Sequence, residues 1–196
     1  MKTKIGVMGS SEIPKDRILI EKAREVGREI ARHNCMLING ATTGIPDEAA
    51  RGCKEEEGFV LGISPAKDLQ DHVKGYKLPY EFYDSIVFTG IGFNFRNIFN
   101  IRTSDAVVFI RGSLGTLNEF TIAYEDGKII GILQHTGGIS EFFDELIEIC
   151  KKQTNATIVR DSDPKRLIRK LVQEVKKRDG FDKSTLKIKA KADNEK

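Results

Sequence analysis

Short apolar runs alternate along the chain with longer stretches in which apolar residues recur every three or four positions. Strands that are buried on both faces read as continuous apolar runs, whereas helices that cover a core show the three-to-four spacing. A regular alternation of the two indicates strand–helix units whose parallel strands form one sheet with helices on both faces. The pattern therefore predicts a single-domain α/β protein of three layers with a central parallel sheet.

The same pattern gives approximate bounds for the elements. The strands are expected at Lys4–Gly9, Cys35–Asn39, Phe59–Ser64, Ser85–Thr89, Asp105–Ile110, Ile129–Leu133 and Thr157–Val159. The helices are expected from Pro14 to about His33, from Ile45 to about Glu57, from Asn94 to Thr103, out of the loop Gly112–Thr116, from Ile139 to Lys152 and from Pro164 to Arg178. Pro65 to Tyr83 shows no regular period, so we expect a long connection of the kind that often carries function.

Composition and charge change this picture only at the end of the chain. The 196 residues are 39% hydrophobic and 31% charged, as in an ordinary globular protein. The formal net charge of +3 is too small to indicate a nucleic-acid partner. Residues 181–196 are rich in lysine and poor in apolar residues. We therefore expect a domain at residues 1–180 followed by a charged, flexible tail at 181–196.

Cysteine usage and hydropathy favour a cytoplasmic protein. Cys35, Cys53 and Cys150 are far apart and form no C-x-x-C pair, which argues against a disulfide framework and against a zinc site. No apolar run approaches the roughly eighteen residues of a membrane span, and the first residues lead directly into a strand. We expect no membrane partner, no metal and no resident cofactor.

Three glycine-bearing loops follow predicted strands, at Gly9–Ser11, Gly40–Gly44 and Gly112–Thr116. In an open parallel sheet these loops share the carboxyl edge, where ligands of Rossmann-like folds bind. Glycine lets the backbone approach an anion closely, and the first N–H groups of the next helix point at that anion. Glycines also make plain tight turns, so one loop alone would leave both interpretations open. Three such loops favour a phosphate site.

The loops contain neither G-x-x-x-x-G-K-[ST] nor G-x-G-x-x-G, which argues against a P-loop triphosphatase and against an ordinary dehydrogenase. A cation, Arg111, follows the apolar fifth strand, where it can face an anionic ligand or pair with Glu119 or Asp126. The residues predicted to bind the phosphate or nucleotide are Gly9, Ser10, Ser11, Gly40, Thr43, Gly44, Arg111, Gly112, Ser113, Leu114, Gly115 and Thr116.

The stretch Phe95–Ala106 contains Ser104-Asp105-Ala106 and is followed by Gly112–Glu119. This arrangement resembles the Lonely Guy (LOG) family, also labelled as lysine decarboxylases, whose hallmark P-G-G-x-G-T-x-x-E follows a strand introduced by S-D-A. The resemblance covers Lys4 to Val175. It implies a Rossmann-like fold that cleaves the N-glycosidic bond of a nucleoside 5′-monophosphate, releasing the base and ribose 5-phosphate.

Within this resemblance, Arg96 and Glu119 match the family's functional pair, and a homodimer is implied. Arg111 stands at the motif's proline and Ser113 at its second glycine. Asn97 replaces a lysine, and Ala41 and Thr42 stand where glycines are usual. These departures resemble a subgroup related to the molybdenum-cofactor carrier proteins, so a non-catalytic nucleotide or molybdenum-cofactor binding protein is the alternative. Lysine decarboxylation gains no support, because no Schiff-base lysine for pyridoxal phosphate can be placed.

Structural roles compete for the same side chains. Thr116-Leu117-Asn118-Glu119 matches a capping box, in which Glu119 would only complete a helix start. Arg96 can equally be a solvated charge on its helix. A stripe at helical spacing, Phe142, Phe143, Leu146 and Ile149, is expected to be core or dimer interface.

Overall fold

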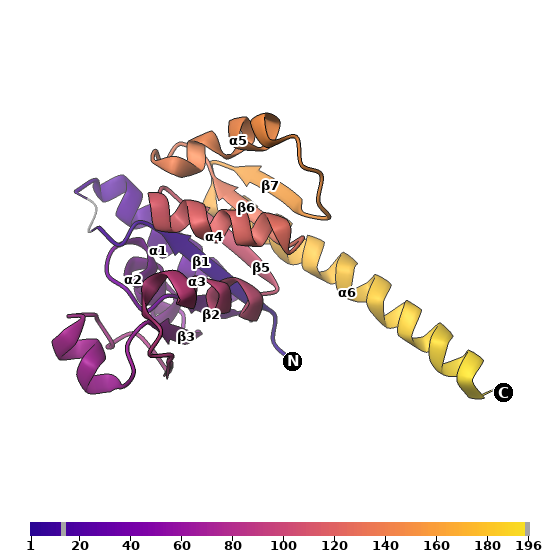
Figure 1. Cartoon of the computed structure of the whole chain (residues 1–196), viewed down its shortest axis with the longest axis horizontal. Coiled ribbons are helices and arrows are strands. Elements are labelled where there is room, and N and C mark those ends of the chain that lie inside the picture. Colours follow the sequence, from indigo (N-terminus) through magenta and orange to yellow (C-terminus); the bar gives the residue numbers. More distant parts are fainter. Residues whose placement is uncertain (13–14, 195–196) are drawn as a thin grey trace.

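The chain forms one parallel sheet of seven strands in the order β4-β3-β2-β1-β5-β6-β7 (Figure 1). The computed structural model describes residues 1–12 and 15–194, with side chains as far as residue 180. The strands are β1 (Lys4–Gly9), β2 (Met36–Asn39), β3 (Phe59–Ser64), β4 (Ser85–Phe88), β5 (Ala106–Ile110), β6 (Ile129–Leu133) and β7 (Thr157–Asp161). The Rossmann-like α/β fold expected from the sequence is confirmed.

Helices cover both faces of the sheet, as Figure 1 shows. The helices are α1 (Arg17–Arg32), α2 (Ile45–Glu55), α3 (Gly92–Thr103), α4 (Leu114–Glu125), α5 (Phe143–Cys150) and α6 (Pro164–Asn194), with a π-helical turn η1 (Asp71–Gly75) and a 3₁₀ turn η2 (Ile139–Phe142). One apolar cluster lies between the sheet and α1, α2 and α6, and a second lies between the sheet and α3, α4 and α5. Alternate residues of the central strands serve the two clusters: Ile5 and Val7 face the first and Met8 the second.

Helix ends differ from the expected bounds most clearly in α1 and α6. α1 begins at Arg17, where the Asp16 carboxylate accepts a hydrogen bond of 2.8 Å from the Ile18 N–H; Pro14 lies outside the described residues. α6 continues to Asn194 instead of ending near Arg178, so most of the expected tail is helical backbone, and the side chains of 181–196 lie outside the described part. No helix within the described residues has the length and hydropathy needed to cross a membrane.

The apolar stripe predicted on the fifth helix does not form one surface. Phe143 is fully buried, and its ring stacks on Phe120 with centroids 3.7 Å apart, while Leu146 packs against the same core. Phe142 and Ile149 are exposed. The reason is that residues 139–142 form a 3₁₀ turn before α5, so a single 3.6-residue period does not run through the segment.

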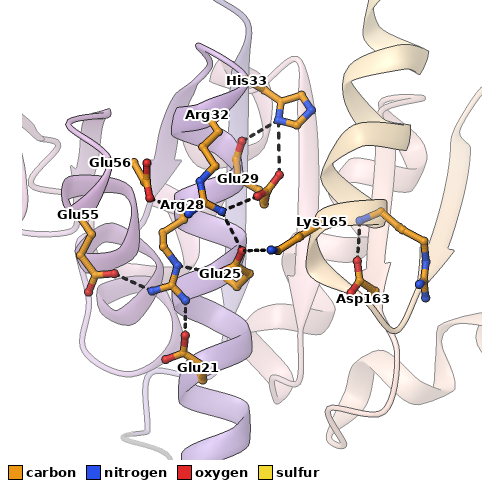
Figure 2. A network of polar contacts seen from close by, with 11 residues as sticks. Glu21, Glu25, Arg28, Glu29, Arg32, His33, Glu55, Glu56, Asp163 and Lys165 are labelled. Atoms are coloured by element: carbon orange, nitrogen blue, oxygen red, sulfur yellow. Dashed lines mark hydrogen bonds and ion pairs between the residues drawn. The ribbon is translucent and has the colours of Figure 1, made fainter.

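α1 and α2 approach each other closely. A Cβ at Gly27 would lie 1.9 Å from the Ala49 carbonyl oxygen, and one at Gly52 would lie 2.0 Å from the Arg24 carbonyl oxygen, so only glycine permits this crossing. Beside the crossing, Arg28 pairs with Glu25 and Glu55 at 2.6 Å each and also contacts Glu21 (Figure 2). The crossing and its ion pairs anchor α2, and with it the loop that leads from β2 into the site.

Candidate functional site

The strand order reverses between β1 and β5, which are neighbours in the sheet. After β1 the chain crosses to one side of the sheet and after β5 to the other, so their loops diverge and leave a crevice. A cleft of about 220 Å³ lies here. Its lining comprises Val7, Met8, Gly9, Ser10, Ser11, Gly40, Thr42, Pro46, Phe93, Asn94, Arg96, Asn97, Ser113, Gly115, Thr116 and Glu119.

One wall of the cleft is the amino end of α4. Ser113 is the residue before the helix, and its side chain makes no hydrogen bond to the helix's first amides. Gly112 has a φ of 92°, and a Cβ there would lie 2.4 Å from the Thr116 side chain, so glycine is needed for this tight entry. A Cβ at Gly115 would meet no protein atom within 4 Å. The helix start therefore offers unpaired N–H groups, the positive end of its dipole and free space.

The opposite wall is the loop after β1, with the buried Ser10 and the exposed Ser11. The loop after β2 supports it from behind: the Ile45 N–H donates to the Ser10 carbonyl oxygen at 2.9 Å, and Thr43 Oγ1 donates to the Ser11 carbonyl oxygen at 2.7 Å. Gly44 fits against this loop, where a Cβ would lie 2.4 Å from the Ser10 carbonyl oxygen. Thr43 and Gly44 therefore shape the site without lining it.

Arg96 of α3 and Glu119 of α4 meet in the inner part of the cleft. Arg96 Nη1 lies 3.7 Å from Glu119 Oε1, and the two side chains are only 5% and 9% exposed. Asn100 Nδ2 donates a hydrogen bond of 2.9 Å to the same carboxylate oxygen. Gly40 leaves the room for the guanidinium, since a Cβ there would lie 2.2 Å from Arg96 Nη1. The lack of a side chain at Gly40 therefore makes the space that the Arg96 guanidinium occupies.

Burial controls the ionisation of this pair. Burial raises the pKa of the Glu119 carboxyl above its ordinary value, and the nearby Arg96 charge and the Asn100 hydrogen bond oppose that shift. Burial likewise lowers the pKa of Arg96, and Glu119 opposes the change. Arg96 Nε and Asn100 Oδ1 are buried without a hydrogen-bond partner among the described residues. Arg96 and Asn100 each therefore keep one buried polar atom for which no described residue provides a hydrogen bond.

Two structural alternatives from the sequence are wrong. The residue before α4 is Ser113, so Glu119 lies six positions further on, beyond the reach of a capping box, and its carboxylate meets Asn100 and Arg96 instead. A capping box with the T-x-x-E spacing requires Thr116 to be the residue directly before the helix. The turn at the left-handed Gly112 instead lets the helix begin three residues earlier, with Ser113 in that place. Arg96 is buried and is not a solvated charge.

Arg111 turns away from the cleft. Its backbone has a φ of 57°, its N–H donates to Thr136 Oγ1 at 3.0 Å, and its Nη1 lies 3.4 Å from the Thr136 carbonyl oxygen. The expected pairing with Glu119 or Asp126 is absent from the described ion pairs, and Asp126 pairs with Arg102 at 2.9 Å. Of the predicted ligand-binding residues, those outside the lining are Thr43, Gly44, Arg111, Gly112 and Leu114.

Sequence reasoning singled out Arg96 but did not predict the other lining residues of α3, which are Phe93, Asn94 and Asn97. Phe93, Arg96 and Asn97, together with Asn100 beneath them, stand at positions i, i+3, i+4 and i+7, so they share one helix face. The spacing was a usable signal. Amphipathic helices normally bury an apolar face, so the pattern favours the opposite orientation, whereas α3 buries Arg96, Asn97 and Asn100.

Comparison with other proteins agrees with this architecture. An uncharacterized protein of Archaeoglobus fulgidus is 33% identical over 130 residues, which are 66% of this chain and 79% of the relative. The structure of the molybdenum cofactor binding protein of Rippkaea orientalis superposes with a TM-score of 0.73 at 26% identity, covering 89% of this chain and 98% of that chain. The molybdenum cofactor carrier protein of Chlamydomonas reinhardtii gives a TM-score of 0.71 at 25% identity, covering 88% and 98%.

The sequence model of one family matches residues 2–168, and that stretch contains every residue of the cleft. The match agrees with the resemblance to the LOG family, which lies in the same superfamily. The chain belongs to the SLOG cluster4 family.

Proposed function

We propose that this protein binds a nucleoside 5′-monophosphate or a related phosphate-bearing cofactor, with the phosphate at the amino end of α4. The observation that carries the proposal is the pairing of uncapped helix amides with open space at Gly115. Backbone N–H groups and a helix dipole suit a phosphate anion. The hydroxyls of Ser10, Ser113 and Thr116 line the same cleft as further donors.

The names of two structurally similar proteins support a cofactor-type ligand. Proteins of this fold from Rippkaea orientalis and Chlamydomonas reinhardtii are described as a molybdenum cofactor binding protein and a molybdenum cofactor carrier protein. A pterin-type cofactor with a phosphate group would use the same amides and hydroxyls as a nucleotide. Binding is therefore the function that the site and the relatives support together.

Hydrolysis of the N-glycosidic bond is the second candidate, and the buried Glu119 favours it. Departure of the base builds positive charge on the ribose, and a carboxylate held in a low-dielectric cleft stabilises that charge in the transition state. Arg96 at 3.7 Å favours the ionised carboxylate that this role needs, and its guanidinium lines the same cleft. Release of free adenine from AMP, followed chromatographically, tests this step.

Gly115→Ala tests the phosphate position, with Gly180→Ala as the matched control. Both glycines are helical, and among the described residues a Cβ at either one meets no atom within 4 Å apart from the helix's own backbone, so neither substitution should destabilise the fold. Only the methyl group at position 115 enters the cleft. We expect calorimetric affinity for AMP to fall about tenfold or more in Gly115→Ala and to stay unchanged in Gly180→Ala.

The possible results of this titration separate the candidates. Binding of AMP with adenine release supports the hydrolase, and binding without release supports the carrier. Equal affinity in both variants, or a wild type that binds neither AMP nor ribose 5-phosphate, would contradict the proposed site.

We further propose a homodimer formed through the outer face of α3. This face carries Phe95, Ile98 and Phe99, which are 71%, 37% and 50% exposed. Such an apolar helix face is unusual in a monomer and typical of an interface core. It replaces the stripe on α5 as the expected contact surface.

A further inference from the structure

We infer that the mouth of the cleft is a subsite for a planar, uncharged heteroaromatic ring, built by Phe93 and Asn94 at the rim with the buried Asn97 beneath them, and held in shape by the long connection between β3 and β4. The inference deepens the proposed function, since it names the group attached to the phosphate and sugar.

The size of the cleft places this ring at its rim. Pockets that enclose small-molecule ligands usually measure roughly 300–1,000 Å³, and the cleft measures about 220 Å³. The inner part therefore takes the phosphate and sugar, between α4 and the loop after β1. Phe93 lines the cleft, yet it is 45% exposed, whereas Arg96 one turn further along α3 is 5% exposed. The remainder of the ligand lies over Phe93.

Phe93 is suited to stack on an aromatic ring. Its ring is fixed by an edge contact with Tyr76, with centroids 5.4 Å apart and planes at 79°, and Arg96 Cζ lies 5.8 Å from its centroid. Nearly half of its surface stays accessible at the mouth of a cleft otherwise rich in polar groups. An aromatic side chain fixed in place and left open is a stacking platform for a base.

The neighbouring side chains define the edge of the ring. Asn94 and Asn97 line the cleft beside Phe93, and both are neutral amides that offer a donor and an acceptor. Asn97 Nδ2 donates to Asn118 Oδ1 at 2.8 Å, which fixes the amide, and its Oδ1 accepts no hydrogen bond from a described side chain. Amides match the alternating donors and acceptors of a purine or pterin edge, whereas a second phosphate would call for a cation.

The long connection between β3 and β4 holds Tyr76 in position beside Phe93. The Pro65 carbonyl oxygen accepts from the Gly92 N–H at 3.2 Å, at the first residue of α3. His72 is fully buried; its Nδ1 lies 2.8 Å from Ser64 Oγ and its Nε2 lies 2.9 Å from the Pro79 carbonyl oxygen. These contacts hold the segment that carries Tyr76 against Phe93. Tyr76 is therefore a positioning residue for the subsite.

The test compares affinities for AMP and for ribose 5-phosphate, which lacks the ring. We expect Phe93→Leu to lower the affinity for AMP about tenfold and to change the affinity for ribose 5-phosphate less than twofold. Phe93→Trp should restore AMP binding. Phe142→Leu, an exposed phenylalanine outside the cleft, is the control and should behave as wild type.

Substitutions of Tyr76 test its positioning role with the same two ligands. Tyr76→Leu should lower AMP affinity severalfold without changing ribose 5-phosphate affinity, and Tyr76→Phe should restore it, since the ring makes the contact. Equal loss of both ligands in Phe93→Leu, or loss of neither, would overturn the subsite while leaving the proposed function standing. A wild type that binds neither ligand would instead refute the proposed function.

Discussion

At the scale of single residues, the chemistry of the cleft depends on a carboxylate that is nearly inaccessible. The whole Glu119 residue is 7% exposed, and its carboxylate lies next to Arg96 and Asn100. Burying two opposite charges is unfavourable unless each compensates the other and hydrogen bonds complete the arrangement. Asn100 supplies one such hydrogen bond to Glu119, whereas Arg96 Nε and Asn100 Oδ1 are buried without a partner among the described residues.

Glu119→Gln should lower the rate of any base release from AMP by roughly a hundredfold or more, because a neutral amide cannot stabilise positive charge on the ribose. It should also lower the free energy of unfolding by about 1–3 kcal/mol, since Arg96 loses its counter-charge while remaining buried. Adenine release and chemical denaturation measure the two effects.

Glu29→Gln is the matched control, because Glu29 is also 7% exposed and lies in the ion-pair cluster of α1 away from the cleft. It should leave the rate of base release unchanged. A Glu119→Gln variant that releases adenine at the wild-type rate would remove Glu119 from the catalytic role.

At the scale of elements, α1 and α2 form the support of the site. A cluster of charges lies beside their glycine crossing: Arg28 contacts glutamates of both helices, and Arg32 contacts Glu56 directly after α2 (Figure 2). Lys165 of α6 joins the cluster through Glu25 at 3.5 Å. Arg28 is the central member, and its side chain is 14% exposed. Its contacts with Glu21, Glu25 and Glu55 raise the pKa of its guanidinium against the effect of burial.

Arg28→Met should lower the free energy of unfolding by about 1–2 kcal/mol at low salt, because three carboxylates lose their shared cation. The difference from wild type should shrink in 1 M salt, where ionic screening acts over about 3 Å. Arg102→Met is the control: its pair with Asp126 is 66% exposed on the arginine side and should change stability by less than about 0.5 kcal/mol. Equal effects of the two substitutions would show that the cluster adds nothing beyond isolated surface pairs.

At the scale of the whole molecule, α3 has one polar face toward the cleft and one apolar face toward solvent. Light scattering at micromolar concentration should give a particle of about twice the 22.0 kDa of the chain. The double substitution Phe95→Glu and Phe99→Glu should yield monomers, because four charges would be buried in a symmetric interface.

Phe142→Glu separates this surface from the one on α5. Phe142 is 55% exposed, and its substitution should leave the dimer unchanged if α3 forms the contact. Dissociation by Phe142→Glu alone would move the interface to α5, and a wild-type particle of 22.0 kDa would refute the dimer.

Most of the fold could be predicted from the sequence. The bounds of β1, β3 and β6 agree with the expected strands, and the loop after β5 leads into α4 as expected. Strand periodicity and glycine turns depend on residues close together in the chain, so a local pattern is enough to locate them. The parallel strand order also predicts that the loops of Gly40 and Gly115 share one edge of the sheet, and both glycines line the cleft.

The sequence by itself determined the α/β order, the glycine loops and the pair of residue types at Arg96 and Glu119. Only the tertiary structure decided that Arg96 is buried, that Glu119 meets Asn100 instead of capping α4, and that Arg111 faces Thr136. The physical reason is that burial and partner choice depend on contacts between residues 19 to 25 positions apart, such as Asn100 with Glu119 and Arg111 with Thr136. Periodicity within one helix carries no information about a partner on another, so the packing of α3 against α4 determines the chemistry of the site.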